Sequence, residues 1–443
     1  MIQARSALDA DWRDAIGMAC AADGGENLSV FAEERHDIVV EADSVAAGAE
    51  AIVTRTAGLN VSQQAGGESR YLAGARPEDL RLLLSGRKGA PVSPTDSSAG
   101  LAQRDEADCR IPVTTVEKTL NLLDSQFHAL RSRVRWVGFR QQMWTHCREE
   151  PVGEIRRAGR LRIEVEARAG DPLTAELAFK GGRSPSDAAV NSLIDGLLDR
   201  IEPFQAASAG RSGEFEVVLA PGLGGILAHE LIGHALEADT VLDGRSWLTQ
   251  LEESRLPPRL TVLDDPRRGR AAWQLDDEGE SAVPTVLLRD GRIGEWLHDL
   301  SSARRCRRSS NGHGRRASFR DPVRPRMGCT FITNGRLEAE EIVSAVGDGI
   351  YVRRMESATT DPSTGRASFR VGDADRIVNG KIEQALKPHL LIVDGAQTLT
   401  RLDQTGNDLA FDTCIGGCHR DGQPLAVSVG APIICIGMVK VVF

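Results

Sequence analysis

The 443-residue sequence predicts an α+β protein with two domains. Residues 1–209 mix strand-like alternation with helical repeats, which predicts a layered α/β domain. Residues 210–443 consist mainly of short strand-like runs between glycine turns, which predicts a mainly β, barrel-like domain. The segment QAASAGRSG (205–213) has the small-residue composition of a linker between the two domains.

The N-terminal domain begins with a predicted helix in which Leu8, Trp12 and Ile16 share one face. LSVFAEER and DIVVEAD then alternate apolar and polar residues on either side of a charged turn, which predicts a β-hairpin. AEAIVTRTAGLNVS (49–62) predicts a second strand pair around a glycine. SGRKGAPVSPTDSSAG (85–100) is rich in Gly, Pro and Ser and predicts a loop.

Two further helices are predicted where apolar residues recur every three or four positions, between residues 116 and 130 and between residues 190 and 201. RLRIEVEAR (160–168) lies between them and alternates as a strand does. Nothing in this domain points to chemistry.

The C-terminal domain opens with EFEVVLAP (214–221), a predicted buried strand that leads into the glycine-rich PGLGG. Strand-like runs and turns then alternate in VPTVLLRDGRIGEWL, ASFRVGDADRIVNGKIEQAL and QPLAVSVGAPIICIGMVKVVF. This pattern is typical of an open or closed β-barrel.

Composition and charge exclude several classes of protein. The net charge of −9 argues against a general nucleic-acid binder, because phosphate binding needs a basic face. No run approaches the roughly 18 apolar residues of a membrane span, and the start, MIQARSALDADWRDAIG, lacks the apolar core of a secretory signal. We therefore expect a cytoplasmic protein that binds neither nucleic acid nor membrane. The eight cysteines are scattered, so reduced thiols are expected.

The segment HELIGH suggests a metal site with unusual geometry. His229 and His234 are five positions apart, which corresponds to about 140° around a regular α-helix, so they could not share one ion there. A wider i→i+5 turn would bring them together, and such bulges are frequent at functional sites. Gly233 is the residue type that would permit this distortion. The C-terminal domain is therefore predicted to carry the metal-site helix.

The alternative is an ordinary helix that contains two unrelated histidines. Glu230 favours the metal site, because a catalytic zinc needs a nearby carboxylate that can take a proton from water. Catalytic zinc usually has three protein ligands and one open position, so a third ligand must come from elsewhere. The candidates are Asp239, His298, His313, Cys414, Cys418 and His419.

PGLGGILAHELIGHALEAD, with its HExxxH core, resembles the signature of the TldD/PmbA family, specifically its metal-bearing TldD half. The blocks LDDEGE, SNGHGRRASF with PRM, GDGIYV, GNDLAFD and GGCHRDGQPLAVSVGAP resemble later blocks of that family in the same order. The resemblance covers the C-terminal half closely and the N-terminal half more faintly, through FAEER.

This resemblance implies a zinc metallopeptidase with one zinc ion per active site. Its ligands would be His229, His234 and Cys418, and Glu230 would be the general base that activates zinc-bound water. A thiolate is a suitable soft ligand for zinc. The resemblance further implies an oligomer, a heterodimer with a related metal-free PmbA/TldE-like subunit, in which the site is enclosed.

Two departures from the family pattern bear on the substrate. His419 follows Cys418 where the family usually has glycine; neighbouring side chains on a strand face opposite ways, so we expect His419 to line the mouth of the site. Arg353, Arg354 and Met355 replace glycines that would let a peptide pair as an added strand. A generic peptide substrate is therefore in doubt, and arginines could bind a smaller or anionic substrate.

The run from Arg304 to Arg326 is unusually basic. It can be interpreted as a solvated loop. It can also be interpreted as a nucleic-acid contact, although the net negative charge of the chain disfavours that. In a third interpretation, Arg315 and Arg316 line the active site and bind a substrate carboxylate. Glu237 and Asp239 are expected to orient the histidines.

Three functional hypotheses follow. The first is a zinc-dependent hydrolase of amide bonds, above all peptide bonds. The second is a related amide hydrolase recruited to small-molecule biosynthesis, which the bulky arginines favour. The third is a non-catalytic, metal-bound assembly subunit, which the complete ligand set and Glu230 disfavour.

Overall fold

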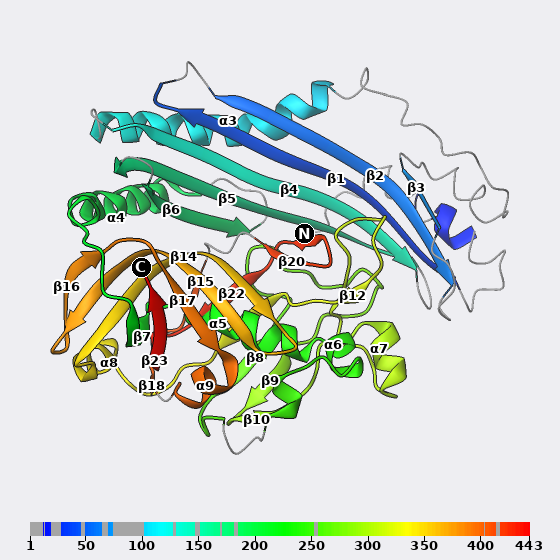
Figure 1. Ribbon diagram of the computed structural model, residues 1–443. Helices are drawn as coiled ribbons and strands as arrows, with labels where there is room; N and C mark the ends of the chain where they lie inside the picture. Colours follow the sequence, from blue (N-terminus) through cyan, green and yellow to red (C-terminus); the bar gives the residue numbers. More distant parts are fainter. Residues whose placement is uncertain are drawn as a thin grey trace.

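Two groups of strands organise the part of the chain that the computed structural model describes (Figure 1). The described residues are 12, 14–18, 28–45, 49–63, 70–73, 102–126, 130–146, 151–168, 171–180, 185–251, 256–402, 404–412 and 417–443. Strands β1 to β6 form one sheet, and the strands from β7 onward form the C-terminal part. This mixed, mostly stranded architecture confirms the predicted α+β class, whereas the domain division after residue 209 stays a prediction.

The N-terminal sheet is antiparallel throughout, in the order β3-β2-β1-β4-β5-β6. Its strands are β1 (Leu28–Asp43), β2 (Glu50–Gln63), β3 (Arg70–Ala73), β4 (Ser132–His146), β5 (Val152–Arg168) and β6 (Asp171–Lys180). β5 contains the segment predicted as a strand from RLRIEVEAR, so that prediction is confirmed.

Helices α3 (Ala102–Gln126) and α4 (Asp187–Gln205) lie along this sheet, as Figure 1 shows. They confirm both predicted helical segments, and Leu130, predicted as part of the first, lies outside α3. Residues 12 and 14–18 are helical, with Trp12 and Ile16 buried as predicted. Leu8 and the predicted loop 85–100 lie outside the described residues.

β1 and β2 are each one long strand, so the two strand pairs predicted for this region are wrong. β1 is paired along almost its whole length with β2 on one side and β4 on the other, which leaves no place for a turn. Its charged residues are accommodated in the sheet: the Arg35 side chain bonds Asp37 (2.8 Å). Gly58 in β2 marks a close approach, because a Cβ there would overlap the ring of Phe319. Gly58 therefore does not mark a turn between two strands. It leaves space for the side chain of Phe319, which is far away in the sequence.

The other face of the N-terminal sheet packs on the C-terminal part. Because alternate strand residues face opposite sides, Ile38 of β1 lies in the core beneath the helices while Glu33 faces the other way. Glu33 accepts a hydrogen bond from the backbone N–H of Phe319 (2.8 Å). Arg156 of β5 donates to Asp277 (2.5 Å). Both faces of the sheet are thus covered, one by helices and one by residues that follow β8.

The C-terminal part contains a closed five-stranded barrel, which agrees with the predicted barrel-like fold. The strands run in the order β14 (Asp348–Asp361), β7 (Gly213–Leu219), β23 (Ile434–Val442), β17 (His389–Asp394) and β15 (Arg366–Val378), and β15 pairs back with β14. β16 (Lys381–Leu386) and β18 (Gln404–Thr405) pair with β15 and β23.

A second, six-stranded sheet and two short hairpins complete this part. The sheet comprises β10 (Arg292–Ile293), β9 (Thr285–Arg289), β8 (Val262–Asp264), β13 (Cys329–Ile332), β22 (Ser428–Ala431) and β19 (Ala410–Asp412). The hairpins pair β11 (Gly314–Arg315) with β12 (Arg324–Pro325) and β20 (Cys418–Arg420) with β21 (Gln423–Leu425).

Short helices connect these strands: α5 (Gly224–Ala228), α6 (Ala238–Leu242), α7 (Leu300–Arg305), α8 (Ala339–Ala345) and α9 (Gly395–Thr400). α5 and the turn after it share the barrel's apolar core, where Leu227 and Leu231 are buried together with Val217 and Phe369. None of the helices in the described part of the chain has the length and apolar character to cross a bilayer.

A buried group of charges lies where the N-terminal sheet meets the C-terminal part. Burial would raise the pKa of Asp277, but Arg315 and Arg156 hold it at about 2. Burial raises the pKa of the neighbouring Asp276 to about 7. Burial and the charge of Asp276 also raise the pKa of Glu278 well above its ordinary value. Two carboxyl groups that resist ionisation, those of Asp276 and Glu278, therefore lie beside the charged carboxylate of Asp277.

These raised pKa values predict how stability depends on pH. The stability contributed by Asp276 and Glu278 is fully present below their ordinary pKa values. It is lost as the pH rises through their raised pKa values, which for Asp276 means through about 7. Glu278→Gln removes one of these two neighbouring carboxyl groups, so it should raise Tm relative to the parent more at pH 8 than at pH 5. One pKa unit is worth about 1.4 kcal/mol, and each kcal/mol shifts Tm by about 2–4 °C.

Thermal unfolding of variant and parent at both pH values measures this difference directly. Glu340→Gln, at an exposed position of α8, is the matched control. A Glu278→Gln effect of equal size at pH 5 and pH 8 would contradict the assignment.

Candidate metal centre

α5 continues directly into a π-helical turn, His229–Gly233. The backbone N–H of His234 donates to the carbonyl oxygen of His229, which is an i→i+5 hydrogen bond. The wider turn that the histidine spacing predicted is therefore confirmed. It brings the two imidazoles together, with ring centroids 5.0 Å apart and ring planes at 84°.

Gly233 is needed in this turn for a reason other than the predicted one. Its dihedral angles, φ −57° and ψ −58°, are those of an ordinary right-handed helix, so backbone freedom is not required. A Cβ at this position would instead overlap Sδ of the buried Met327. Any larger residue would have to displace Met327 or the turn, so Gly233 allows close packing behind the histidines.

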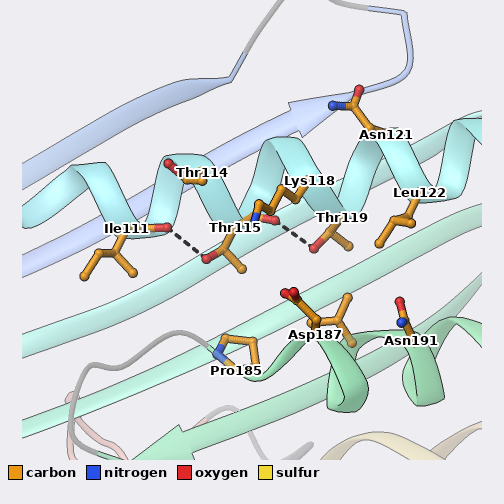
Figure 2. Close-up of a pocket in the computed structure, with 11 residues that line it drawn as sticks. Ile111, Thr114, Thr115, Lys118, Thr119, Asn121, Leu122, Pro185, Asp187 and Asn191 are labelled. Carbon is orange, nitrogen blue, oxygen red and sulfur yellow. Dashed lines mark hydrogen bonds between the residues drawn. The ribbon is translucent and has the colours of Figure 1, made fainter.

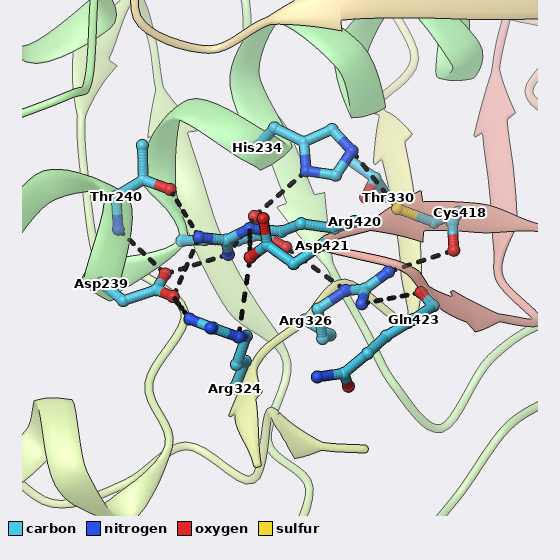
Figure 3. Close-up of polar contacts among 12 residues, drawn as sticks. His234, Asp239, Thr240, Arg324, Arg326, Thr330, Cys418, Arg420, Asp421 and Gln423 are labelled. Atoms are coloured by element: carbon cyan, nitrogen blue, oxygen red, sulfur yellow. Dashed lines mark hydrogen bonds and ion pairs between the residues drawn. The ribbon is translucent and has the colours of Figure 1, made fainter. Parts of the chain in front are cut away.

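Cys418, from the hairpin β20–β21, completes a cluster with the two histidines. One nitrogen from each imidazole and Sγ of Cys418 all lie within 4.8 Å of one another. Sγ is 3.3 Å from Nε2 of His234, and Figure 3 draws this contact as a dashed line. All three side chains are buried, and 184 positions separate Cys418 from His234 in the sequence. Two segments far apart in the sequence therefore offer three ligand atoms to one point.

The other described candidates for a third ligand lie outside the cluster. His298 is buried and hydrogen-bonded to a serine hydroxyl of α7 (3.2 Å). His313 lies 3.2 Å from the carboxylate of Asp264. His419 is exposed on the opposite side of β20 from Cys418, as expected for neighbouring strand residues; its place at the mouth of the site stays a prediction. Cys414 lies outside the described residues.

The electrostatics of the cluster suit a cation. Burial would raise the pKa of the Cys418 thiol, but His234 and His229 hold it well below its ordinary value. Burial would lower the pKa of His234, but Cys418 and Glu237 raise it well above its ordinary value. Cys418 and Glu237 thus place negative charge around His234, which favours a cation at this point.

His229 provides a second sign of a missing partner. It is fully buried, and neither ring nitrogen has a hydrogen-bond partner of good geometry among the described residues. A buried polar atom without a partner costs about 1–3 kcal/mol. Two imidazoles and a thiolate form a ligand set that suits zinc, so these residues fit the ion that the sequence predicted.

Glu237 holds His234 in place. Its Oε2 lies 3.0 Å from Nδ1 of His234 and also accepts a hydrogen bond from Arg420 (2.7 Å). Burial would raise the pKa of Glu237, but His234 and Arg420 lower it to about 2. Asp239 pairs with Arg420 (2.9 Å), as Figure 3 draws, and Arg420 also bonds Glu237. The role of Asp239 in orienting the histidines stays a prediction.

Glu230 lies in the π-helical turn beside His229 and is partly exposed. Among the described residues, no hydrogen bond or ion pair occupies its carboxylate. It is thus the accessible carboxylate of a turn whose other members are buried.

The predicted substrate-binding arginines Arg315 and Arg316 lie against the N-terminal sheet. Arg315 donates to the buried Asp277 (3.2 Å) and covers the ring of Trp273 at 4.1 Å. The guanidinium of Arg316 lies 4.5 Å above the ring of Phe31. Both are buried. The contact between Arg316 and Phe31 joins the two parts of the molecule. The burial and internal contacts of both arginines argue against the predicted role in binding a substrate carboxylate.

Arg353 and Arg354 have carboxylate partners within the barrel. Arg353 pairs with Asp375 of β15 (2.5 Å), and Arg354 pairs with Glu356 of β14 (2.8 Å). The register of β14 against β15 shifts around Arg354, so the strand is irregular where the bulky residues replace the expected glycines. Internal pairing leaves these arginines less available to an anionic substrate than the sequence suggested.

Two arginines beside the cluster were not predicted as site residues. Arg420 follows Cys418 by two positions on β20, and alternate strand residues share a face, so the strand period could have identified it. Arg326 donates to the carbonyl oxygen of Cys418 (3.1 Å). Because 92 positions separate Arg326 from Cys418, spacing alone gives no signal for this contact.

A separate groove of about 720 Å³ lies between α3 and α4 (Figure 2). The hydroxyls of Thr115 and Thr119 in this groove donate to the carbonyl oxygens of Ile111 and Thr115, each at 2.8 Å. Among its described lining residues no histidine or cysteine occurs, so the groove does not compete with the cluster as a metal site.

A closed barrel, a long antiparallel sheet and a buried His–His–Cys cluster define an α+β protein with an internal candidate metal site. Residues 212–442 match the family described as PmbA/TldA metallopeptidase C-terminal domain. The chain belongs to the PmbA/TldD metallopeptidase family.

Relatives of this family are similar to part of the chain. A metalloprotease TldD homolog from Buchnera aphidicola subsp. Schizaphis graminum is 34% identical over 226 residues, which cover 50% of this chain and 47% of that protein. A zinc metalloprotease TldD homolog from Saccharolobus solfataricus is 28% identical over 291 residues, 63% of this chain and 64% of that one. The matched region thus spans about half the length of relatives such as the Buchnera protein.

The fold is also shared with solved structures. TldE from Thermococcus kodakarensis superposes with a TM-score of 0.75 at 14% sequence identity, over 97% of this chain and 100% of that chain. At this identity, the similarity concerns the fold alone.

The geometry predicts which thiol controls metal content. Cys418→Ala removes one of three candidate ligands, so zinc affinity should fall by more than the roughly 10–100-fold that loss of an outer partner causes. Metal analysis of the purified protein after dialysis against a chelator measures the retained zinc. Cys329→Ala removes another buried thiol, outside the cluster, and should retain the parent's zinc content. Equal zinc in the Cys418→Ala variant and the parent would exclude this cluster as the metal site.

Proposed function

We propose that this protein is a zinc-dependent hydrolase of amide bonds, with peptides as the leading substrate class. The observation that carries the proposal is the buried convergence of His229, His234 and Cys418, whose ligand atoms lie within 4.8 Å of one another. These residues would hold one zinc ion. Bound there, zinc would act as a Lewis acid that lowers the pKa of water and polarises the substrate carbonyl.

Glu230 is the proposed general base. Its partly exposed carboxylate belongs to the same π-helical turn as His229 and is free to accept a proton from water. The same carboxyl group can then return the proton to the leaving amine. No covalent bond between enzyme and substrate is needed in this scheme.

His234 would be held ready by Glu237. Because Nδ1 of His234 is bonded to Glu237 (3.0 Å), Nε2 is the atom directed at the cluster, 3.3 Å from Sγ of Cys418. A carboxylate on the outer nitrogen fixes the ring orientation and increases the basicity of the ligating nitrogen. Glu237 therefore supports the ligand set without contacting the substrate.

A small amide is the second candidate substrate. The residues Arg353, Arg354 and Met355 on β14 favour it, because side chains of this size hinder a peptide backbone from pairing closely with the strand. A purely structural role is disfavoured by the complete cluster and by the unoccupied Glu230.

The proposal includes a cytoplasmic location and a heterodimer with a related, metal-free subunit. Support for the pairing comes from the family, whose relatives include TldD homologues, and from the fold shared with a TldE protein. Activity assays should therefore include co-expression with such a subunit.

Glu230→Gln tests the mechanism. The variant should bind zinc as the parent does, because Glu230 is outside the ligand set, and its kcat should fall by about 10²–10⁴-fold. Hydrolysis is measured on a peptide library and on small anionic amides, with the partner subunit present, and zinc is measured in parallel. Asp243→Asn, an exposed carboxylate just after α6, is the matched control.

The two substrate arms separate the two candidate functions. Turnover of peptides supports the leading candidate, and turnover of small amides alone supports the second. Full activity of the Glu230→Gln variant on either class would refute the assigned base.

A further inference from the structure

Arg326 lies between the two segments that supply the candidate ligands (Figure 3). It directly follows β12, and its side chain is fully buried. Nη2 donates to the carbonyl oxygen of Cys418 (3.1 Å), and Nη1 donates to that of Gln423 (3.2 Å). Nε lies 3.7 Å from Oε1 of Glu237, close enough for an ion pair but too far for a good hydrogen bond.

The two carbonyl contacts fix the hairpin that carries Cys418. β20 and β21 are joined by a tight turn, and Cys418 and Gln423 lie on its two strands. A guanidinium group that bonds both strands holds the backbone of Cys418 at one distance from β12. The planar fork of arginine suits this task because its donors have fixed directions.

The guanidinium of Arg326 is also linked to His234 through the carboxylate of Glu237. Glu237 lies between Arg326 and Arg420 and bonds Nδ1 of His234. Arg326 thus touches the main chain of one candidate ligand and the carboxylate that orients another. Among the described residues, Nε of Arg326 and Oε1 of Glu237 lack hydrogen-bond partners. Burial of an incompletely paired charge costs stability, so an apolar side chain would serve a purely packing role better.

We propose that Arg326 is a positioning residue of the metal centre, which sets the separation between Cys418 and the imidazole of His234. This inference rests on the proposed function, because it presupposes that the cluster binds zinc. It goes beyond the proposed ligands, because Arg326 would not bind the metal itself but would fix the distance between two residues that do.

Zinc affinity tests this role independently of catalysis. Chelator competition on the full chain at one fixed pH should give an affinity about 10–100-fold lower for Arg326→Gln than for the parent. Arg326→Lys keeps the charge near Glu237 but loses the fixed fork, so its affinity should be intermediate. If Arg326→Gln does not fold, the test is made on Arg326→Lys. Its zinc affinity should be at least about threefold lower than that of the parent.

Arg156→Gln is the matched control. Arg156 is also a buried arginine that bonds a carboxylate and a backbone carbonyl, those of Asp277 and Leu275, but it lies outside the cluster. Its replacement should lower Tm and leave zinc affinity unchanged. If the Arg326 variants likewise lose stability but bind zinc as the parent does, Arg326 is structural and the inference is overturned. If the parent itself takes up no zinc, the proposed function fails together with the inference.

Discussion

The hydrogen bond from the N–H of His234 to the carbonyl of His229 is the constraint on which the candidate site depends. On a regular helix, the two imidazoles would point about 140° apart. The π-helical turn brings their ring centroids to 5.0 Å, and packing of Met327 against Gly233 supports the turn from behind. Because the preceding helix lies in the barrel core, the whole fold fixes this local distortion.

Buried charges perform two separate tasks in the molecule. Around Glu237, two arginines and a histidine hold the side chains that surround the cluster. Around Asp277, Arg156 joins the N-terminal sheet to the C-terminal part, and Arg315 pairs with the same carboxylate. In both groups burial opposes ionisation and the paired cations restore it, so the pKa of each central carboxylate is about 2.

Local patterns were enough to predict part of this structure. The helices near the N-terminal sheet, the barrel strands and the wide turn all follow from periodicity and from the spacing of two histidines. The length of β1 and β2 could not be predicted in this way. The charged run in β1 and Gly58 in β2 resemble turns in the sequence, and only the contact between Gly58 and Phe319 explains the glycine. Arg326 and the packing reason for Gly233 depend likewise on contacts between segments far apart in the sequence.

X-ray absorption spectroscopy at the zinc edge of the purified protein, with its partner subunit, tests the central claim most directly. The account predicts one sulfur at about 2.3 Å and two imidazole nitrogens at about 2.0–2.1 Å from one ion. A first shell without sulfur, or with a single imidazole, would contradict the convergence of His229, His234 and Cys418.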